Sequence, residues 1–565
     1  MLNVSIAQIN PIVGDLRGNL EKMLSVLEDV HTISHMVIFP ELALSGYFPE
    51  DLLLRQDFLT ACEETLQELA DRTKDLETLV VVGTPLYQGD LYNSLAVLYR
   101  GKVIGTYSKG RLPNYSVFDE VRYFREGDRP LILDVNGSKI GFSICEDIWY
   151  PDHLERFTAL SGAEVIVNIN ASPYHIGKQE FREGFVRARA QDNLCFVVYA
   201  NLVGGHEELV FDGRSMVIDP LGRIVARAKA FEEDLLTVSL DVEEVRRRRL
   251  LDLRWRNASR EVEPVPPSAE VNLPSKPQVE PRLEPSPEGE AEIYKAIVLG
   301  TRDYVHKSGF SKAIVGLSGG IDSSLTACIA VDALGKENVL GIFMPSRFSS
   351  RESFEDAKEL AENLGIEFHT VPIDEVYVSY HNELTPVLGE VKFDIADENI
   401  QARIRANILF YLSNKLRYMV LSTSNKSEVA TGYTTIYGDM AGGFAPLKDV
   451  YKTTVYKLAR YRNSLGEVIP HRVFEKPPSA ELKPGQKDQD TLPPYDVLDG
   501  ILKLYVEGNL PPERIIEEGY DKATVVRVVN MIRKAEYKRK QSPPGVKITP
   551  RAFGKDWRVP IINKF

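Results

Sequence analysis

The stretch from Ala313 to Ala327, AIVGLSGGIDSSLTA, constrains the fold more than any other part of the chain. Its apolar start, up to Leu317, is typical of a buried parallel strand, and the apolar spacing after Ile321 predicts a helix. The glycines between them let backbone N–H groups approach an anion, and a helix N-terminus adds unpaired donors. This order predicts a phosphate site in an α/β domain, although a short Ser-Gly-Gly segment can also be an ordinary strand-to-helix turn.

The polar residues of this loop narrow the kind of ligand it can hold. Several hydroxyl groups add donors, and Asp322 places a carboxylate beside the phosphates, where it makes sense mainly as a metal ligand. The lysine of the kinase-type G-x-x-x-x-G-K-[ST] loop is missing, so γ-phosphoryl transfer is not expected. The sequence SGGIDS resembles the pyrophosphate loop of the ATP pyrophosphatases, which activate a carboxylate as its adenylate. This resemblance implies that ATP is bound by Gly316, Leu317, Ser318, Gly319, Gly320, Ile321, Asp322, Ser323 and Ser324.

Length, charge and cysteine content limit the remaining possibilities. A chain of 565 residues is too long for one core, and its net charge of −13 argues against nucleic-acid or anionic-membrane partners. The four cysteines are far apart and form no C-x-x-C pair, so disulfides and a zinc site are not expected. Neither a signal segment nor a long apolar run is present. We therefore expect a soluble cytoplasmic protein.

A proline-rich segment divides the chain. Eight prolines fall between residues 264 and 287, where apolar periodicity is almost lost. We expect residues 1–260 to form one domain, 261–287 a linker and 288–565 a second domain. Mixed strand pairs with helices outside them predict a layered α/β first domain, and alternating strands and helices predict a doubly wound, Rossmann-like parallel sheet in the second.

Three reactive side chains of the first domain follow predicted strands. Glu41, Lys109 and Cys145 each stand directly after an apolar run, where the sites of α/β proteins assemble. A lysine ammonium favours the thiolate and stabilises an oxyanion, and a glutamate can carry the thiol proton to a leaving amine. The set is sufficient for acyl transfer from an amide. A cysteine after a strand is, however, usually a small core residue, and spacing alone does not decide between these interpretations.

The segments PEL (40–42), KGRLP (109–113) and SICEDIW (143–149) resemble the three motifs of the nitrilase superfamily, in the same order. The resemblance implies an α-β-β-α sandwich in which Glu41 is the general base, Lys109 stabilises the oxyanion and Cys145 is the nucleophile. Residues 115–124 are similar to the glutaminase branch of that superfamily. This similarity implies a glutamine pocket with Tyr115, Ser172 and Lys178. Glu120 is either a second carboxylate that orients Lys109 or a solvated residue at a helix end.

A second carboxylate of the C-terminal domain follows the predicted strand at 419–422. Glu428 ends the segment TSNKSE, and together with Asp322 and phosphate oxygens it would suit octahedral Mg²⁺. Thr423 stands where that strand should meet the nucleotide. The glycine-rich segment 432–453 is either a turn-rich loop or a flexible lid.

Residues 290–565 resemble the NAD synthetase family through the segments GLSGGIDSS, ENIQARIR, TSNKSE, KPPSAEL and KAEYKRKQSPPG. The resemblance implies ATP contact by Thr423, Mg²⁺ or dinucleotide contact by Asp322 and Glu428, and deamido-NAD binding by Asn399, Glu428 and Lys538. It also favours dinucleotide binding over a solvated helix face for the basic run 533–540. Gln489 departs from the pattern, because many relatives carry a glutamate there.

Together the two resemblances imply ATP-dependent amidation of deamido-NAD to NAD. Glutamine would supply NH₃, which an internal tunnel would protect from protonation. The alternatives are amidation of a different carboxylate and an amidase regulated by a nucleotide-sensing domain. We also expect a homo-oligomer, a dimer through the second domain or larger.

Overall fold

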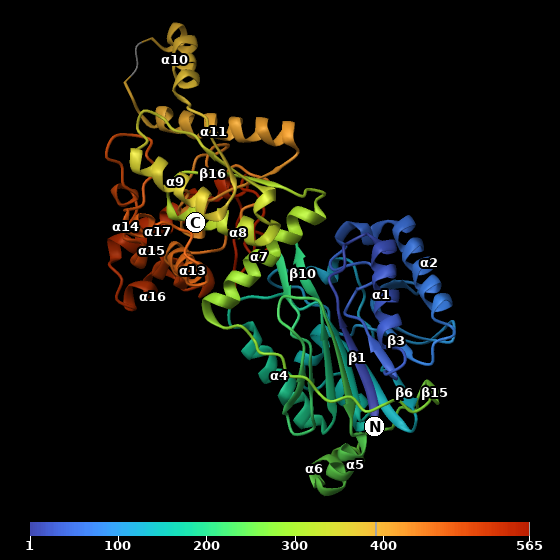
Figure 1. The fold of residues 1–565 in the computed structure, drawn as a ribbon. Helices are drawn as coiled ribbons and strands as arrows, with labels where there is room; N and C mark the ends of the chain where they lie inside the picture. Colours follow the sequence, from blue (N-terminus) through green and yellow to red (C-terminus); the bar gives the residue numbers. More distant parts are fainter. Residues whose placement is uncertain (390–391, 564–565) are drawn as a thin grey trace. The chain divides into compact units, whose positions relative to one another are not determined.

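The computed structural model describes residues 1–389 and 392–563 of the chain (Figure 1). The described chain forms two compact units. The first contains residues 1–204 and 211–287, and the second contains residues 205–210 and 288–565.

Two sheets of mixed direction form the first unit. The first sheet has the order β14-β1-β2-β3-β4-β5, and the second has the order β13-β12-β9-β8-β7-β6-β15. The strands of the first sheet are β1 (Leu2–Gln8), β2 (Met36–Ile38), β3 (Leu79–Tyr87), β4 (Leu91–Tyr99), β5 (Lys102–Ser108) and β14 (Asp234–Leu240). Those of the second are β6 (Ile132–Val135), β7 (Ser138–Ile144), β8 (Val165–Asn170), β9 (Phe196–Asn201), β12 (Met216–Ile218), β13 (Ile224–Arg227) and β15 (Ala269–Val271). A separate hairpin pairs β10 (Val203–His206) with β11 (Leu209–Asp212).

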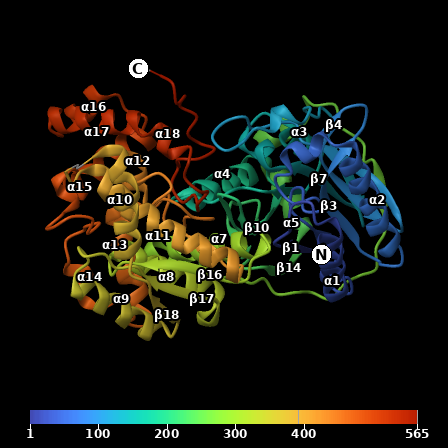
Figure 2. The ribbon, with the colours of Figure 1, turned by 90° about the horizontal axis from the view of Figure 1, so that it is seen from above.

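Side chains on the two faces of each sheet form three apolar layers, one between the sheets and one on the outer face of each sheet. Ile6 and Val81 of the first sheet share a central core with Phe142 and Val167 of the second. The opposite face of the first sheet packs against α1 (Leu16–Val30) and α2 (Gln56–Arg72), and the opposite face of the second packs against α4 (Lys178–Asn193). In both ribbon views α1 and α2 lie on one side of the strands and α4 on the other (Figures 1 and 2). The predicted α-β-β-α sandwich is confirmed.

The proline-rich segment lies against the first unit along most of its length. Its strand β15, which the sequence pattern did not predict, pairs in parallel with β6. Further along, the Arg227 N–H donates to the Arg282 carbonyl at 2.8 Å, and the Glu284 N–H donates to the Arg227 carbonyl at 3.1 Å. Proline has no backbone N–H and cannot donate in such a ladder. The pairing therefore uses the N–H groups of the residues that lie between the prolines.

A parallel sheet forms the centre of the second unit. Its order is β18-β17-β16-β19, with β16 (Ala313–Leu317), β17 (Val339–Phe343), β18 (Glu367–Thr370) and β19 (Met419–Leu421). The helices α8 (Ile321–Leu334) and α9 (Arg351–Leu364) connect the strands in one direction, and α11 (Ile395–Leu416) leads back to β19 (Figure 2). Ile404 and Leu409 of α11 pack on Ile314 and Ile342 of the sheet. The doubly wound parallel sheet is confirmed.

The remaining helices of both units complete the two bodies. In the first unit these are α3 (Leu154–Leu160), α5 (Val242–Leu251) and α6 (Leu253–Ala258). In the second unit they are α7 (Gly289–Lys307), α10 (Asp374–Leu388), α12 (Lys426–Thr431), α13 (Lys452–Ser464), α14 (His471–Glu475), α15 (Tyr495–Leu502), α16 (Pro512–Glu517), α17 (Lys522–Lys534) and α18 (Glu536–Arg539). Within the described ranges, every helix is too short or too polar to cross a membrane.

Candidate active sites

Three charged side chains meet in the interior of the first unit. Glu41 follows β2, Lys109 follows β5, and Glu120 begins a short 3-10 helix; all three are buried. The Lys109 Nζ donates to Glu41 Oε1 at 2.7 Å and to Glu120 Oε1 at 2.9 Å. Glu120 is therefore not a solvated residue at a helix end, and it lies where it can hold the ammonium of Lys109.

Neutral donors complete the surroundings of the two carboxylates. The Asn93 Nδ2 donates to Glu41 Oε1 at 2.8 Å, and the Ala171 N–H donates to Glu41 Oε2 at 2.8 Å. The Tyr47 hydroxyl donates to Glu120 at 2.9 Å. Because each oxygen has a fixed donor, the carboxylates keep one orientation relative to the ammonium.

Cys145 stands at the turn that follows β7. It begins a short 3-10 helix with a positive φ of 43°, which turns the chain sharply at the end of the strand. Burial raises the pKa of its thiol well above the ordinary value, and the nearby Glu41 raises it further, whereas Lys109 lowers it. The resting thiol is therefore protonated at neutral pH, and a base must remove its proton when it reacts.

The charged groups around Lys109 also affect one another. Burial opposes the charge of Lys109, but Glu120 and Glu41 outweigh it and raise its pKa well above the ordinary value. Burial raises the pKa of Glu120, and Lys109 partly offsets this. The ammonium is thus charged while it lies out of contact with water, and it is available to stabilise an oxyanion.

The predicted glutamine-pocket residues lie around this centre. The Tyr115 hydroxyl donates to both carboxyl oxygens of Glu146 at 3.0 Å. The Lys178 Nζ lies 4.5 Å from the centre of the Trp149 ring, and its pKa is lowered by burial while Cys145 raises it. Burial and Glu146 raise the pKa of Tyr115 most, and Cys145 raises it further. Tyr115 and Lys178 therefore both lie close enough to Cys145 to interact electrostatically with its sulfur.

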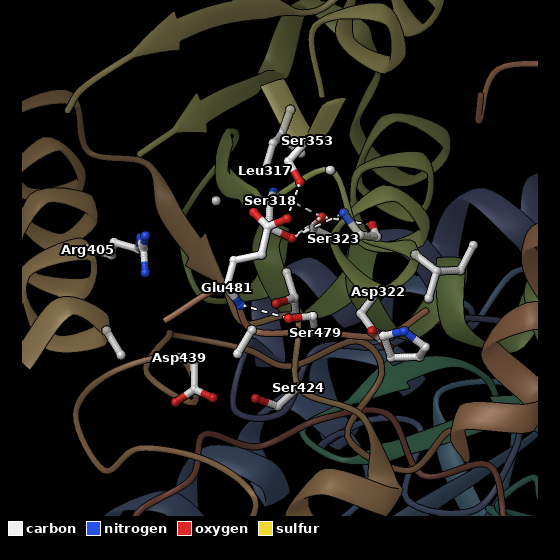
Figure 3. Close-up of a pocket in the computed structure, with 18 of the residues that line it drawn as sticks. Leu317, Ser318, Asp322, Ser323, Ser353, Arg405, Ser424, Asp439, Ser479 and Glu481 are labelled. Carbon is white, nitrogen blue, oxygen red and sulfur yellow. Dashed lines mark hydrogen bonds between the residues drawn. The ribbon is translucent and has the colours of Figure 1, made fainter. Parts of the chain in front are cut away.

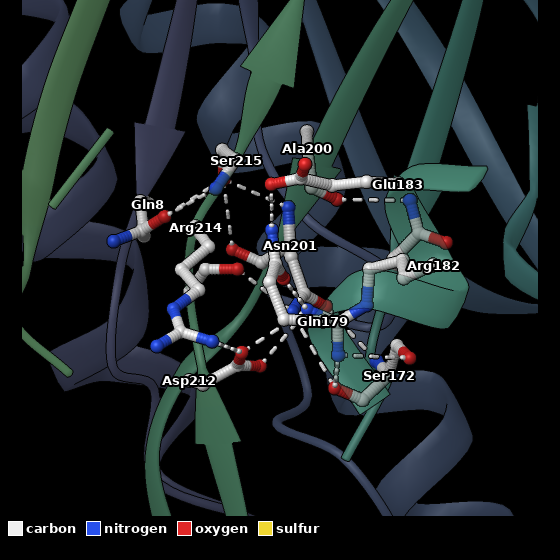
Figure 4. Close-up of polar contacts among 12 residues, drawn as sticks. Gln8, Ser172, Gln179, Arg182, Glu183, Ala200, Asn201, Asp212, Arg214 and Ser215 are labelled. Carbon is white, nitrogen blue, oxygen red and sulfur yellow. Dashed lines mark hydrogen bonds and ion pairs between the residues drawn. The ribbon is translucent and has the colours of Figure 1, made fainter. Parts of the chain in front are cut away.

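Ser172 is held by a buried polar network (Figure 4). Its N–H donates to Asn201 Oδ1 at 2.9 Å, and its carbonyl and hydroxyl oxygens accept from Arg182 Nη2 at 3.3 Å each. Arg182 is itself paired with Asp212, at 3.1 Å. The sequence pattern did not identify this pair, because an arginine inside a helix is usually solvated.

A cavity of about 270 Å³ opens beside the phosphate loop in the second unit (Figure 3). Of the predicted ATP residues, Gly316 to Ser323 and Thr423 line it. Ser324 does not; it is buried, and its hydroxyl donates to the Gly320 carbonyl at 2.8 Å. The loop thus presents its backbone and the start of α8 to the cavity, as a phosphate site requires.

Gly319 is the residue that the loop geometry restricts most. Its φ is +73°, and an added Cβ would lie 2.3 Å from the Ser353 carbonyl oxygen. Only glycine fits this backbone conformation and this close approach without a shift of the main chain.

Lys452, which the sequence pattern did not assign, lies between the two predicted metal ligands. Its Nζ hydrogen-bonds to Asp322 and lies 3.8 Å from Glu428. Burial raises the pKa of Glu428, and Asp322 raises it further. Asp488 also lines the cavity, whereas its neighbour Gln489 does not. A cation is needed between these carboxylates, and Lys452 provides one.

Asp322 and Glu428 are also the candidate ligands of a divalent metal ion. Within the described residues, no group of three histidine, cysteine or acidic side chains could hold a metal ion. The oxygens of Asp322 and Glu428 are nevertheless hard ligands in a cavity that can take phosphates, and Mg²⁺ ordinarily uses one or two carboxylates plus phosphate oxygens and water. The ligand types therefore suit Mg²⁺ that arrives with a nucleotide, but both Asp322 oxygens accept hydrogen bonds here, from Asn425 and Lys452, and the ion would have to replace one of these donors.

The predicted dinucleotide residues Asn399 and Lys538 meet at one loop rather than at the cavity wall. The Asn399 Oδ1 accepts from the Thr435 hydroxyl at 2.8 Å. The Lys538 Nζ donates to the carbonyls of Gly432 and Thr434 at 2.7 Å each. Further along this glycine-rich segment, residues 444–452 are buried, so that part is a packed turn-rich loop and not an open lid.

Other cavity residues also escaped prediction. They are Arg405, Asp439, Lys476 and Glu481. Arg405, Lys476 and Glu481 fall within segments that resemble NAD synthetases, and this was the available signal. A charged residue in a helix or loop is not otherwise marked as functional in a single sequence.

Comparisons with known proteins agree with both units. The NAD synthase family model matches residues 293–542, and the carbon-nitrogen hydrolase family model matches residues 3–250. A glutamine-dependent NAD(+) synthetase from Aquifex aeolicus is 64% identical over 565 residues, covering 100% of both chains. One from Thermotoga maritima is 50% identical, over 100% of this chain and 99% of that relative.

A solved structure extends the similarity to the fold. The glutamine-dependent NAD+ synthetase from Acinetobacter baumannii, in complex with ADP, matches with a TM-score of 0.73 at 38% identity, over 100% of this chain and 98% of that one. The unit with the buried Glu41–Lys109 pair matches the carbon-nitrogen hydrolase family, and the unit with the phosphate-loop cavity matches the NAD synthase family. The chain belongs to the glutamine-dependent NAD(+) synthetase family.

Proposed function

We propose that this protein converts deamido-NAD to NAD with ATP and with ammonia released from glutamine. The observation that carries the proposal is the presence, in one chain of this family, of a buried Glu41–Lys109 ion pair beside a cysteine and of a phosphate-loop cavity. One site has the groups to cleave an amide, and the other has the shape to hold a nucleotide.

In the first unit, Cys145 would attack the carboxamide carbon of glutamine. Glu41 accepts the thiol proton as the C–S bond forms, and Lys109 faces the oxygen that becomes negative. Glu41 then returns the proton to the nitrogen as the C–N bond breaks, and NH₃ leaves. Water, activated by Glu41, hydrolyses the thioester to glutamate. Tyr115, Ser172 and Lys178 would hold the amino-acid end of glutamine.

In the second unit, the loop 316–324 and Thr423 would hold ATP, while Asn399, Glu428 and Lys538 would hold deamido-NAD. The nicotinate carboxylate attacks the α-phosphorus and pyrophosphate leaves; ammonia then attacks the acyl carbon and AMP leaves. The N–H groups at the start of α8 and the Lys452 ammonium stabilise the phosphate charge. Mg²⁺ held by Asp322 and Glu428 would add further neutralisation of that charge.

Ammonia must reach the adenylate without being protonated, because ammonium is not a nucleophile. We therefore propose an enclosed passage for NH₃ between the two sites. We also propose a homo-oligomer, a dimer through the second domain or larger, and a location in the cytoplasm, where four unpaired cysteines would stay reduced.

The test is the formation of AMP and NAD by the purified full-length protein. AMP should form only when deamido-NAD is present, with either glutamine or ammonium chloride as the nitrogen source. The Cys145→Ala variant should lose the reaction with glutamine and keep the reaction with ammonia. AMP formation without deamido-NAD, or loss of both reactions in the variant, would contradict the proposal.

A further inference from the structure

A buried carboxylate links the strand ends that carry Lys109 and Cys145. Asp147 lies two residues after the cysteine and is fully buried. Its Oδ1 accepts from the N–H groups of Gly110 at 3.0 Å and Arg111 at 2.8 Å, which directly follow Lys109. Its Oδ2 accepts from the Tyr107 hydroxyl at 2.7 Å and from the Ile144 N–H at 2.9 Å.

All four donors belong to the two segments that position the reacting groups. Tyr107, Gly110 and Arg111 flank Lys109 on either side, and Ile144 immediately precedes Cys145. A single rigid side chain thus fixes the lysine segment to the cysteine turn. We propose that Asp147 is the positioning residue that sets the distance between the Cys145 thiol and the Lys109 ammonium; the inference rests on the amide-cleaving half of the proposed function.

The charge state of Asp147 suits this role. Burial raises the pKa of its carboxyl to about 6, while the Ile144 N–H and the Tyr107 hydroxyl lower it. At pH 7.5 it is therefore ionised and acts only as an acceptor, which matches four donors and no acceptor. His153 approaches Oδ1 at 3.7 Å, but burial and Arg111 lower its pKa to about 4, so it is neutral and no ion pair competes for the carboxylate.

The substitution Asp147→Asn keeps the shape and removes half of the acceptor set. The asparagine amide keeps one acceptor oxygen, and its NH₂ group replaces the other oxygen. Two of the four groups that donate to Asp147 would then face this NH₂ group instead of an acceptor. The Tyr107 hydroxyl can reverse and accept, whereas the backbone N–H groups cannot. The amide NH₂ should therefore turn toward Tyr107 and Ile144, and the link to the cysteine turn should be lost.

Glu155 offers a matched control eight positions along the chain. It is also buried, on α3, and within the described part of the chain neither of its carboxyl oxygens has a hydrogen-bond partner. Burial raises its pKa well above the ordinary value and the negative charge of Asp147 raises it further, so Glu155 is neutral and Glu155→Gln exchanges one neutral group for another. The two variants make the same carboxyl-to-amide change, and only one of them breaks the link.

The experiment compares Asp147→Asn, Glu155→Gln and wild type in the full-length protein. For Asp147→Asn we expect kcat with glutamine to fall about 100-fold, the effect of a small misplacement of reacting groups, with KM for glutamine within about threefold of wild type. NAD formation with ammonia should be unchanged. Glu155→Gln should match wild type in all three quantities. A glutamine kcat for Asp147→Asn near wild type, or equal loss with glutamine and ammonia, would overturn the inference.

Alkylation of Cys145 by iodoacetamide gives a readout that needs no substrate. The rate, followed by mass spectrometry of the peptide that contains Cys145, should fall in Asp147→Asn and stay at the wild-type value in Glu155→Gln; equal rates in all three proteins would count against the inference. This measurement remains decisive if the wild type fails to use glutamine, a result that would instead refute the proposed function. Should Asp147→Asn fail to fold, Tyr107→Phe removes one donor only and should give a smaller loss of glutamine kcat; no loss would again overturn the inference.

Discussion

Replacement of Glu120 by glutamine should disable the amide-cleaving site and leave the nucleotide site active. Lys109 is fully buried and bonded to two carboxylates, Glu41 at 2.7 Å and Glu120 at 2.9 Å. In the proposed mechanism Glu41 becomes neutral when it takes the thiol proton, and Glu120 is then the remaining negative partner of the ammonium. Without it, the charged form of Lys109 loses support at the step where an oxyanion must be stabilised.

The size of the effect follows from the burial of the pair. Removing one partner of a buried ion pair costs about 3–5 kcal/mol, and each 1.4 kcal/mol is a factor of ten in rate. The glutamine side chain keeps one acceptor for the lysine, so we take the lower half of this range and expect kcat with glutamine to fall about 100- to 1000-fold.

The assay is the initial rate of NAD formation with glutamine and with ammonium chloride. The ammonia-dependent rate of Glu120→Gln should equal that of wild type, and it serves as the control for folding. A glutamine-dependent rate within about threefold of wild type would refute the claim that Glu120 holds the charge of Lys109 during the reaction.

Three further predictions concern other parts of the chain. Lys452→Met should lower ammonia-dependent NAD formation about 100-fold, because Asp322 and Glu428 lose their cation, while glutamine hydrolysis persists; Lys457→Met, exposed on the same helix, is the control and should have no effect. Gly319→Ala should raise KM for ATP and lower stability by about 2 kcal/mol or more, because a Cβ meets backbone at a positive φ. Gly309→Ala, at φ +83° with open space around it, should cost only about 1 kcal/mol and leave KM unchanged, and equal effects of the two in urea melts and ATP titrations would contradict the argument. His153 has a pKa lowered by burial to about 4, so its contribution to stability is present above pH 6.5 and is lost as pH falls toward 4. Between pH 7.5 and 5 the wild type should lose about 2 kcal/mol more than His153→Gln in urea unfolding of the first unit, and parallel losses would contradict this.

Strong apolar periodicity made the central elements predictable. The strand at 313–317 and the helix after it were expected from the sequence and are β16 and α8. The strand β15 was not predictable, because three residues within a proline-rich segment carry no period of two. The edge strand β14 does carry such a pattern, because Leu236, Val238 and Leu240 alternate with less buried residues; only its pairing with the distant strand β1 has no local signal.

The candidate sites also contain some residues that the sequence points to and others that it does not. Glu41, Lys109 and Cys145 could be proposed as one site because each follows a strand and belongs to a motif. Arg182 and Lys452 could not, since their importance depends on carboxylates 30 and 130 positions away in the chain. Such pairs arise only from the tertiary fold, and one sequence holds no local trace of them.

The short hairpin tip at residues 205–210 has a practical consequence for anyone who wishes to divide this enzyme. The boundary cuts through both strands of the hairpin: residues 203–204 and 211–212 count with the first unit, and residues 205–210 count with the second. There the Gly205 N–H donates to Asp303 Oδ2 at 2.7 Å, and the Glu208 carbonyl accepts from the Lys547 N–H at 2.8 Å. A fragment starting at residue 288 would lack the tip, so Asp303 Oδ2 and the Lys547 N–H would lose these partners. The two halves therefore cannot be separated by one cut, and a stand-alone synthetase half would need a grafted peptide or compensating surface changes.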